Sequence, residues 1–523
     1  MSSRVSTRLP AAVDVPLLGD PEWRDRFRED AAHYPGGGAA GVLRPRTTDD
    51  VSSCLRGAGR ILPVGAQSSL TGGATPMNDV VLSTELLTSI GIEGDRVRVG
   101  AGVPLQRVQD ALAPAGRWFA PVPTYLGAFA GGAVATGAAG AATFKYGTVR
   151  EWVHGLTVVL AGGHVLDLTR GQCQASDDGT FEIDTAAGSR LIRVPPITMP
   201  DVPKRSAGYF AASGMDLVDL FIGSEGTLGV ITEVVFRTAP LPGGMCRALV
   251  PVAGEPAAIQ LAADLRRASE AGQVDIAAIE HMDARSIQVL REDGVDTKLD
   301  VVLPTGAAVV LLVDLELPAP ATPAALWAEL ESARDGAVDT PLTRFCRILD
   351  RHHALDDAEI ALPGNHARAA AFADLREAVP AGVNRRVALA KQHDARISKT
   401  AADMIVPFQH FAEMMDVCRR LFADRGLDLA VWGHISDGNV HPNVIPRDVE
   451  DVEAGRDAIL ALGTEVIRLG GSPLAEHGVG RSPIKQRLLH QLYGEAGIAA
   501  MRAVKLSLDP HGTLAMGVIF PTE

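Results

Sequence analysis

The chain contains little cysteine and no closely spaced cysteine pair. Its 523 residues include only five cysteines, which are dispersed singly. Without a C-x-x-C pair, an iron–sulfur cluster or a structural zinc ribbon is not expected. An odd, scattered set of cysteines is typical of reduced thiols in a cytosolic protein. The five residues are Cys54, Cys173, Cys246, Cys346 and Cys418.

Long membrane-spanning runs and excess positive charge are also lacking. The uncharged run from Phe119 to Phe144 is interrupted by prolines and crowded with glycine and alanine, so it is a poor membrane span. Met1 to Asp14 lacks the pattern of a secretory signal. The net charge of −14 argues against nucleic acid as a partner. We expect a soluble, cytoplasmic protein, with peripheral membrane attachment as an alternative; a homodimer is compatible with the sequence.

The order of elements indicates an α+β protein of two domains. The apolar fraction of 46% and the charged fraction of 21% are ordinary for a globular chain, and the length suits two cores. Strand-like and helix-like patterns alternate without a regular βαβ repeat. The expected helices cover residues 21–32, 104–113, 259–270 and 323–333, and the expected strands cover 80–82, 96–99, 156–160, 163–168, 307–317 and 427–432.

A proline- and glycine-rich segment, Pro240–Gly244, marks the expected boundary between the domains. We expect a lead-in at residues 1–40 and a first domain at 41–240. A second domain would cover 241–480 and carry the histidine-rich segments, and residues 481–523 would return to the first domain.

The segment Trp432–Asn443, W-G-H-I-S-D-G-N-V-H-P-N, carries the most functional information. Asp437-Gly438 predicts a two-residue turn, because Gly adopts positive φ without strain. That turn would place His434 opposite His441, and Asn443 on the same face of the hairpin. Two imidazoles so placed can bind one metal ion. The alternative is a polar hairpin with two hydrogen-bonded histidines.

A second segment, Ala475–Gly480, offers Glu476 and His477 in a glycine-flanked turn. Two histidines and one glutamate form a divalent-metal site with an open position, as in catalytic zinc sites. The histidine pairs in Glu280-His281 and His352-His353 are assigned no catalytic role.

Three loops of small residues precede the expected boundary. They are Pro63–Ala74, Ala130–Gly140 and Phe221–Thr232. Small residues allow close approach of the backbone to an anion, although such a loop taken alone is more often only a turn. The second loop implies a backbone packed tightly against something flat or against another backbone. Three such loops in one domain suit a long, flat dinucleotide.

Taken in order, these motifs resemble those of the FAD-linked D-2-hydroxyacid dehydrogenases of the vanillyl-alcohol oxidase superfamily. The most specific are G-S-E-G-T-L-G-V-I-T, from Gly223 to Thr232, and G-H-x-x-D-G-N-x-H-x-N, from Gly433 to Asn443. The resemblance covers residues 41–519. It implies an FAD-binding domain of the PCMH type and an α+β cap domain with an antiparallel sheet.

The resemblance also implies which residues hold FAD. The first loop would bind the pyrophosphate, and the other two would line the flavin. Neither histidine nor cysteine occurs between Pro63 and Thr75, so we expect non-covalent binding. The implied residues are Pro63, Val64, Gly65, Ala66, Gln67, Ser68, Ser69, Gly131, Gly132, Ala135, Thr136, Gly140, Glu225, Gly226 and Val230.

By the same resemblance, His434, His441 and Glu476 would bind zinc or manganese. His477, adjacent to Glu476 but pointing elsewhere, would accept the substrate proton with a near-neutral pKa. Arg376 lies in a segment resembling one whose arginine clamps the substrate carboxylate. Asn443 would support the substrate or the metal ligands, and Lys399 would supply a second cation.

The implied activity is oxidation of a D-2-hydroxy acid such as lactate or glycolate to the 2-oxo acid. A hydride would pass to the flavin, and electrons would pass on to a non-nicotinamide acceptor: a quinone, a cytochrome or an electron-transfer flavoprotein. One alternative is a flavin-bearing subunit of a glycolate-oxidase-like complex. Another is a non-redox flavoenzyme similar to alkylglycerone-phosphate synthase.

Overall fold

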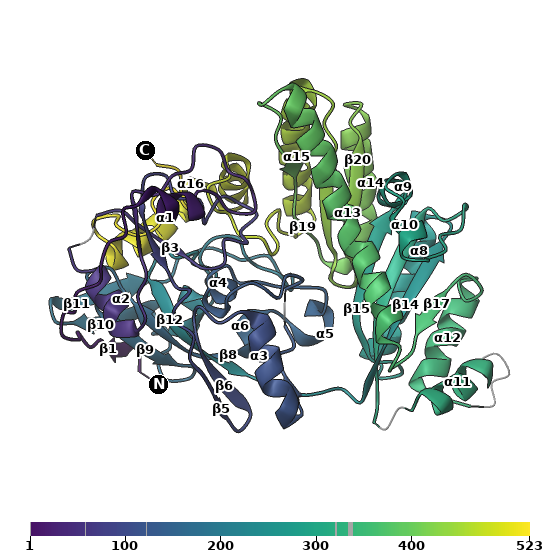
Figure 1. The fold of residues 1–523 in the computed structure, drawn as a ribbon, viewed down its shortest axis with the longest axis horizontal. Helices are drawn as coiled ribbons and strands as arrows, with labels where there is room; N and C mark the ends of the chain where they lie inside the picture. The colour runs from purple at the N-terminus through teal and green to yellow at the C-terminus, as the bar shows by residue number, and fades with distance from the viewer. Residues whose placement is uncertain (1, 58, 122, 320–321, 333–337, 523) are drawn as a thin grey trace.

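The computed structural model describes residues 2–57, 59–121, 123–319, 322–332 and 338–522. Figure 1 shows two bodies side by side, with both termini on the first. The first body contains the N-terminal half together with the C-terminal segment, and the second contains most of the chain between them. The α+β prediction is confirmed by this mixture of helices and mainly antiparallel sheets.

Two sheets form the centre of the first body. One is parallel with strand order β2-β4-β3, and the other is antiparallel with order β5-β6-β12-β8-β9. Strands β4, β6, β8 and β9 confirm the strands expected at 80–82, 96–99, 156–160 and 163–168. The bounds are β2 (Gly41–Leu43), β3 (Ile61–Val64), β4 (Val80–Ser83), β5 (Ile90–Glu93), β6 (Arg96–Gly100), β8 (Val153–Val159), β9 (Val165–Thr169) and β12 (Val230–Arg237).

Two smaller sheets complete this body. They have strand orders β1-β10-β11 and β13-β7. The expected boundary at residue 240 coincides with the end of β13. The bounds are β1 (Arg4–Ser6), β7 (Arg117–Trp118), β10 (Thr180–Thr185), β11 (Gly188–Arg193) and β13 (Ala239–Pro240).

The helices of the first body are short. In α3, Leu105, Val108 and Leu112 are fully buried, as their helical spacing predicts. The first helix ends at Arg26 instead of residue 32, because Asp30 leaves the helical path to bond with the backbone of Ala74 and the side chain of Thr75. The helices are α1 (Pro21–Arg26), α2 (Thr48–Cys54), α3 (Leu105–Leu112), α4 (Ala130–Ala135), α5 (Thr143–Tyr146), α6 (Val149–Trp152) and α7 (Leu217–Phe221), with the 3-10 helix η1 (Ala113–Ala115).

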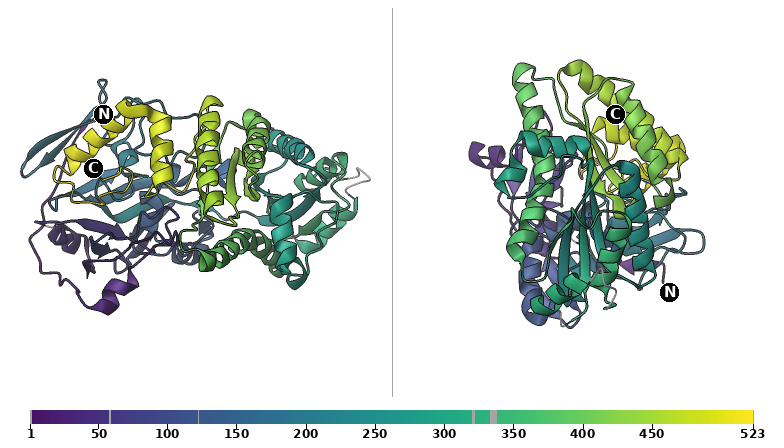
Figure 2. Two further views of the ribbon diagram at one scale, coloured as in Figure 1. Left: turned by 90° about the horizontal axis from the view of Figure 1, so that it is seen from above. Right: turned by 90° about the vertical axis from the view of Figure 1, so that its right-hand side faces the viewer.

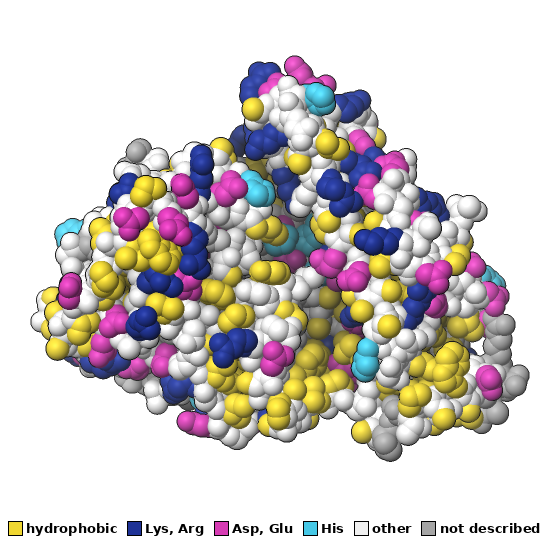
Figure 3. Space-filling model, viewed as in Figure 1, with side chains coloured by type: hydrophobic (Ala, Val, Ile, Leu, Met, Phe, Trp, Pro, Cys, Tyr) yellow, Lys and Arg dark blue, Asp and Glu magenta, His cyan; other side chains and the backbone are white. Residues whose placement is uncertain are grey.

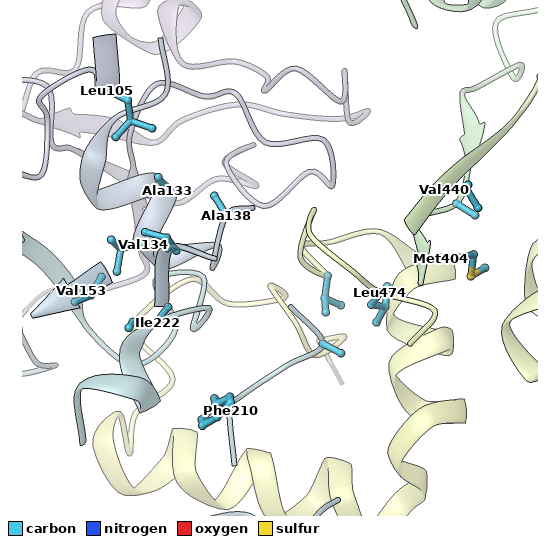
Figure 4. Packing of buried hydrophobic residues seen from close by; sticks show 14 of the residues in the cluster. Leu105, Ala133, Val134, Ala138, Val153, Phe210, Ile222, Met404, Val440 and Leu474 are labelled. Atoms are coloured by element: carbon cyan, nitrogen blue, oxygen red, sulfur yellow. The ribbon is translucent and has the colours of Figure 1, made fainter. Parts of the chain in front are cut away.

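Helix α4, within the second small-residue loop, packs against another backbone as predicted. The Gly131 N–H donates to the carbonyl of Ala101, and a Cβ at Gly131 would lie 2.5 Å from the Ala101 Cβ. On its other side Val134 lies in the core near Val153 and Ile222 (Figure 4). Only a residue without a side chain fits at position 131, which explains this part of the loop's composition.

The second body is built on one large antiparallel sheet. Its strand order is β17-β14-β16-β15-β20-β21-β18, and β19 also pairs with β21. Strands β16 and β20 confirm those expected at 307–317 and 427–432. The bounds are β14 (Gly244–Val252), β15 (Ile276–Asp283), β16 (Val309–Leu317), β17 (Glu359–Ala361), β18 (Thr400–Ala401), β19 (Met404–Ile405), β20 (Leu429–His434) and β21 (Asn439–Val444).

Helices cover both faces of this sheet (Figure 2). Helices α9 and α13 contribute to one core with Met282 and Leu375, while α8 contributes to the other with Ile279 and Leu265. Residue 333, the expected end of α11, lies outside the described residues. The helices are α8 (Glu255–Glu270), α9 (Ala284–Glu292), α10 (Val295–Lys298), α11 (Pro323–Ser332), α12 (Pro341–Arg351), α13 (His366–His393), η2 (Phe408–His410), α14 (Phe411–Ala423), η3 (Ile435–Asp437) and α15 (Val449–Arg468).

The last helical segment, α16 (Pro483–Leu508), consists of two helices joined at a kink at Gly494 and brings the chain back to the first body. Lys505 Nζ donates to the carbonyl of Thr227, and Leu514 forms a bridge with Ile61. Among the described residues, no helix has both the length and the apolar character needed to cross a membrane.

Candidate active site

The segment Trp432–Asn443 forms a hairpin with a different register from the predicted one. His434 lies opposite Asn439, and Trp432 lies opposite His441, so the predicted pairing of His434 with His441 is wrong. A two-residue primed turn needs positive φ at its first central position, which is Asp437 here, and the type I′ turn needs it at both. Here Asp437 belongs to η3, and Gly438 alone within this turn has positive φ, at 83°.

The shift in register nevertheless keeps the functional side chains on one face. The difference is two residues, and side chains alternate with a period of two, so no side chain changes face. The rings of His434 and His441 have centroids 5.5 Å apart at an angle of 87°. The predicted proximity of these two imidazoles is therefore confirmed.

Three imidazoles converge on one oxygen of Glu476. Glu476 Oε1 lies 3.4 Å from His434 Nε2, 3.3 Å from His441 Nε2 and 3.5 Å from His477 Nε2. The prediction that His477 points elsewhere is thus wrong. Its ring turns toward the cluster because both its backbone N–H and its Nδ1 lie against Asp403 Oδ2, at 2.9 and 3.2 Å. Histidine and acidic side chains are visible at the bottom of a hollow between the bodies (Figure 3).

A carboxylate lies behind each imidazole. His434 Nδ1 lies 3.1 Å from Glu280 Oε1, and His441 Nδ1 lies 3.4 Å from Asp403 Oδ1. With Asp403 also at His477 Nδ1, all three rings have a carboxylate at Nδ1. In this arrangement each ring places Nε2 on the side of Glu476 and Nδ1 on the side of a carboxylate, as imidazoles with second-shell carboxylates do at metal sites.

The electrostatics of the cluster are strongly perturbed. Burial lowers the pKa of His434, but Glu280 and Glu476 reverse this effect and raise it to about 9. Burial lowers the pKa of His477 to about 4, against the opposing effect of Asp403, so the near-neutral value expected from the sequence differs from the value in the fold. Against burial, Lys204 and His434 hold the pKa of Glu476 well below its ordinary range.

The set His434, His441 and Glu476 fits a divalent cation. Zinc bonds to nitrogen and oxygen of about 2.0–2.1 Å imply that neighbouring ligand atoms in a tetrahedron are about 3.3–3.4 Å apart. The separations of 3.4 and 3.3 Å from Glu476 Oε1 to His434 and His441 agree with this spacing. A second grouping, Asp403, His441 and His477, also has the required proximity. The Asp403 oxygens, however, already accept N–H groups from Glu476, His477 and Asn439, which favours a hydrogen-bonding role.

Lys204 is a site residue that the sequence reasoning missed. Its side chain is fully buried, and Nζ lies 2.8 Å from Glu476 Oε2 and 3.2 Å from Asp437 Oδ2. Nζ also donates to Asn439 Oδ1 at 3.1 Å. Lys204 belongs to the chain between β11 and α7, so a cation from the first body reaches into the cluster of the second.

Asp403 and Glu280 were missed as well. An isolated charged residue in a strand or loop has no distinctive spacing, and Glu280 carried only a weak signal as the neighbour of His281. Against burial, Arg376 and His434 lower the pKa of Glu280, whereas His477 and His441 hold that of Asp403 well below its ordinary range.

The predicted substrate residues lie at different distances from this cluster. Arg376 is buried, and its Nε donates to Glu280 Oε2 at 3.1 Å, so one carboxylate separates it from His434. Asn443 is buried; Nδ2 donates to the carbonyl of His441, while Oδ1 has no hydrogen-bond partner in the described part of the chain. Lys399 precedes β18 and reaches solvent, although the surrounding protein and Lys485 lower its pKa to about 8.

Glu225, in the third small-residue loop, contacts the other two loops and the turn that follows Glu476. Its backbone N–H donates to the carbonyl of Ala135, and its two carboxylate oxygens accept the N–H groups of Val479 and Gly480, each at 2.8 Å. A Cβ placed at Gly73, in the first loop, would lie 3.5 Å from Glu225 Oε2. The predicted flavin loops therefore adjoin the turn that carries Glu476 and His477. Burial raises the pKa of Glu225 to about 7.

The individual FAD-binding candidates differ in backbone conformation, burial and position. Gln67 and Glu225 both have positive φ, 52° and 51°, a strained state for residues with side chains. The Gln67 amide is occupied by the carbonyls of Phe27 and Ala74, so it braces the first loop. Val64 and Val230 are buried in the core. The other candidates are placed as follows: Pro63 in β3, Gly65, Ala66, Ser68 and Ser69 in the loop after it, Gly131, Gly132 and Ala135 in α4, Thr136 at its end, Gly140 beyond it, and Gly226 beside Pro63.

Gly132, in α4, faces open space. A Cβ at Gly132 would meet no atom within 4 Å, in contrast to its crowded neighbour Gly131. Glycine at an uncrowded helical position costs stability, so the lack of a side chain there suits close approach of a ligand.

Comparisons with known proteins agree with this arrangement. Residues 39–169 match the family described as FAD binding domain, and residues 247–519 match FAD linked oxidases, C-terminal domain. A D-lactate dehydrogenase of Archaeoglobus fulgidus is 27% identical, covering 91% of this chain and 90% of its own. A glycolate oxidase subunit GlcD of Bacillus subtilis is 27% identical over 92% and 89%. A D-2-hydroxyglutarate dehydrogenase of Xanthomonas citri is 26% identical over 92% and 89%.

A solved structure of an alkyldihydroxyacetonephosphate synthase has the same fold. It aligns with a TM-score of 0.59 and 14% identity, covering 97% of this chain and 82% of that one. The two family matches, the shared fold and the loops that meet at Glu225 lead to one conclusion: this chain is an FAD-binding oxidoreductase and belongs to the FAD-linked oxidases of the vanillyl-alcohol oxidase flavoprotein family.

Proposed function

We propose that this chain oxidises a D-2-hydroxy acid to the 2-oxo acid, using non-covalently bound FAD and a divalent metal ion, zinc or manganese. The observation that carries the proposal is the convergence of three imidazole Nε2 atoms on Glu476 Oε1, 3.3–3.5 Å away, beside the loops that meet at Glu225. Names of the relatives, which include D-lactate and D-2-hydroxyglutarate dehydrogenases, support the same substrate class.

His434, His441 and Glu476 would hold the metal, and the loops at residues 63–69, 131–140 and 225–230 would hold FAD. When bound, the flavin supplies a hydride acceptor and the metal supplies a Lewis acid that acidifies the substrate hydroxyl. Three protein ligands leave coordination positions for a small chelating substrate.

His477 would accept the hydroxyl proton at Nε2. Its pKa of about 4 keeps the ring unprotonated at neutral pH. Asp403, 3.2 Å from Nδ1, holds the tautomer that leaves Nε2 free and stabilises the imidazolium once the proton arrives. Because that proton comes from a hydroxyl acidified by a cation, a base of low pKa is sufficient.

Arg376 would orient the substrate carboxylate. Guanidinium recognises carboxylates through paired N–H groups, and Glu280 fixes the Arg376 side chain at Nε. The unpaired Oδ1 of Asn443 and the ammonium of Lys399 are further candidates for contacts with the substrate. Electrons would then leave to a non-nicotinamide acceptor: a quinone, a cytochrome or an electron-transfer flavoprotein.

A second candidate is a flavin-bearing subunit that requires partner chains. It is favoured by one relative, which is named a glycolate oxidase subunit. Turnover by the isolated chain would support the first candidate, and activity that appears only with added partners would support the second.

The decisive experiment is an anaerobic titration of the FAD-loaded protein with D- and L-2-hydroxy acids, followed by flavin absorbance. We expect one D-acid to bleach the flavin, chelation to abolish bleaching and added zinc or manganese to restore it. A loaded protein that no hydroxy acid reduces contradicts the proposal and favours non-redox use of the fold.

A further inference from the structure

The two oxygens of Glu476 have different surroundings. Oε1 faces the three imidazoles, whereas Oε2 lies 2.8 Å from the ammonium of Lys204. A carboxylate that binds a metal through both oxygens must direct both at the ion. Oε2 is occupied by the ion pair with Lys204, whereas Oε1 is the oxygen beside the imidazole nitrogens.

Lys204 is itself held firmly. Its side chain is fully buried, and Asp437 and Asn439 provide oxygen atoms 3.2 and 3.1 Å from Nζ. Among the described residues, Asp437 has no hydrogen-bond partner for either carboxylate oxygen apart from this ion pair. A buried cation with three oxygen neighbours has little freedom to leave Glu476.

The backbone around Lys204 connects the metal-site turn to a flavin loop. The Ser206 N–H donates to the carbonyl of Ala475, directly before Glu476. The Ser206 hydroxyl donates to the carbonyl of Gly137, in the second small-residue loop. Val202 packs with Ile405 and Ala475 in a small separate core. The segment Val202–Ser206 therefore has contacts with both groups of site residues.

We propose that Lys204 is a positioning residue that restricts Glu476 to binding the metal through Oε1 alone. The coordination position that Oε2 would otherwise fill then stays open for the second oxygen of a chelating 2-hydroxy acid. This inference rests on the proposed function, because it concerns the metal site of that reaction. It adds a residue from the first body whose own atoms contact neither metal nor substrate.

The test compares wild type with K204M, in which the charge is lost and the length is nearly kept. Each protein is loaded with Co²⁺ alone, and the d–d absorption, which weakens as coordination number rises, is recorded without substrate. We expect intense bands for wild type and a several-fold loss of intensity for K204M. Steady-state assays should show the KM for the hydroxy acid raised roughly tenfold or more in K204M.

Two further variants control for folding. K505M removes a partly buried lysine that is ion-paired with Asp509 in and beyond α16, and it should leave the Co²⁺ spectrum unchanged. If K204M yields no folded protein, K204Q keeps a donor for Asn439 and should show the same spectral loss.

The outcomes separate the two proposals. Intense bands that are equal in wild type and in a folded Lys204 variant, with equal KM, overturn the role of Lys204 and leave the metal site standing. Wild type that binds no Co²⁺ overturns both. Equal spectra combined with a raised KM also count against the proposal, because coordination is the property that Lys204 should control.

Discussion

Asp403 Oδ2 lies 3.2 Å from His477 Nδ1, and the same oxygen accepts the backbone N–H groups of Glu476 and His477. One carboxylate thus contacts both the backbone of the turn and the ring of the proposed base. In D403N an amide replaces the carboxylate, so an NH₂ group can face His477 Nδ1 where the proposed role requires a hydrogen-bond acceptor. We expect kcat to fall roughly 10–100-fold, as second-shell replacements at such sites do. Steady-state flavin reduction across pH measures this change.

A matched control for this variant lies outside the site. His352 Nε2 is 2.8 Å from Asp264 Oδ2 in another Asp–His pair. D264N should leave kcat unchanged. Equal activity of D403N and wild type would show that Asp403 does not orient the base.

Metal binding should release a proton from His434. Its pKa of about 9 means that the ring is protonated at pH 7.5 in the metal-free protein, and a ligand imidazole must be neutral. Zinc affinity should therefore rise with pH up to about pH 9. Because Glu280 is the largest group raising this pKa, E280Q should release fewer protons at pH 7.5. Calorimetry of zinc binding in buffers of different ionisation enthalpy counts the protons; identical counts for both proteins would contradict the assignment.

Glu225 should make the flavin-free protein less stable as pH rises. Its pKa is about 7 in the fold against an ordinary 4.5, so between these values the folded state keeps a proton that the unfolded chain has lost. The stability of wild type relative to E225Q should fall by roughly 3 kcal/mol from pH 4.5 to 7.5. Urea unfolding at several pH values measures this difference. Parallel pH profiles for the two proteins would rule out a raised pKa.

Removal of Arg376 should destabilise the fold as well as impair substrate binding. Arg376 and Glu280 are both buried and lie 3.1 Å apart, so R376M leaves a buried carboxylate without its strongest neutralising partner. The expected cost is about 3–5 kcal/mol in free energy of unfolding. R396M, which removes an exposed arginine paired with Asp394, should leave the unfolding midpoint unchanged. Urea unfolding of both variants compares their losses of stability. Equal small losses in R376M and R396M would contradict the prediction.

Two adjacent glycines in α4 should respond in opposite ways to alanine. In G131A the new methyl group meets Ala101, and we expect a loss of about 1–3 kcal/mol of stability. In G132A the methyl group meets no protein atom, so the flavin-free protein should keep or gain stability. If the flavin occupies that space, G132A should weaken FAD binding roughly tenfold, as followed by flavin fluorescence. Unchanged FAD affinity in G132A would place the flavin elsewhere.

Much of the local structure could be predicted from residue order. Leu105, Val108 and Leu112 specify one buried helical face, and the small residues around Gly131 indicate close backbone contact. His434 and His441 share a face even though the predicted register was wrong by two residues, because side-chain alternation has a period of two. The turn itself was not predictable from Asp437-Gly438, since Asp437 forms an ion pair with Lys204, 233 positions away in sequence.

The sequence by itself therefore indicated the three metal-ligand candidates and the small-residue loops, and the role of His477 as base came from the family resemblance. The small-residue loops and the shared face of His434 and His441 depend on short-range sterics and strand alternation, which act over a few neighbouring residues. Only the tertiary structure decided that Glu280, Asp403 and Lys204 complete the cluster. Each is a single charged residue in its own segment, and its partner depends on where distant parts of the chain pack. Burial then makes those pairings strong, because charges removed from water require close partners.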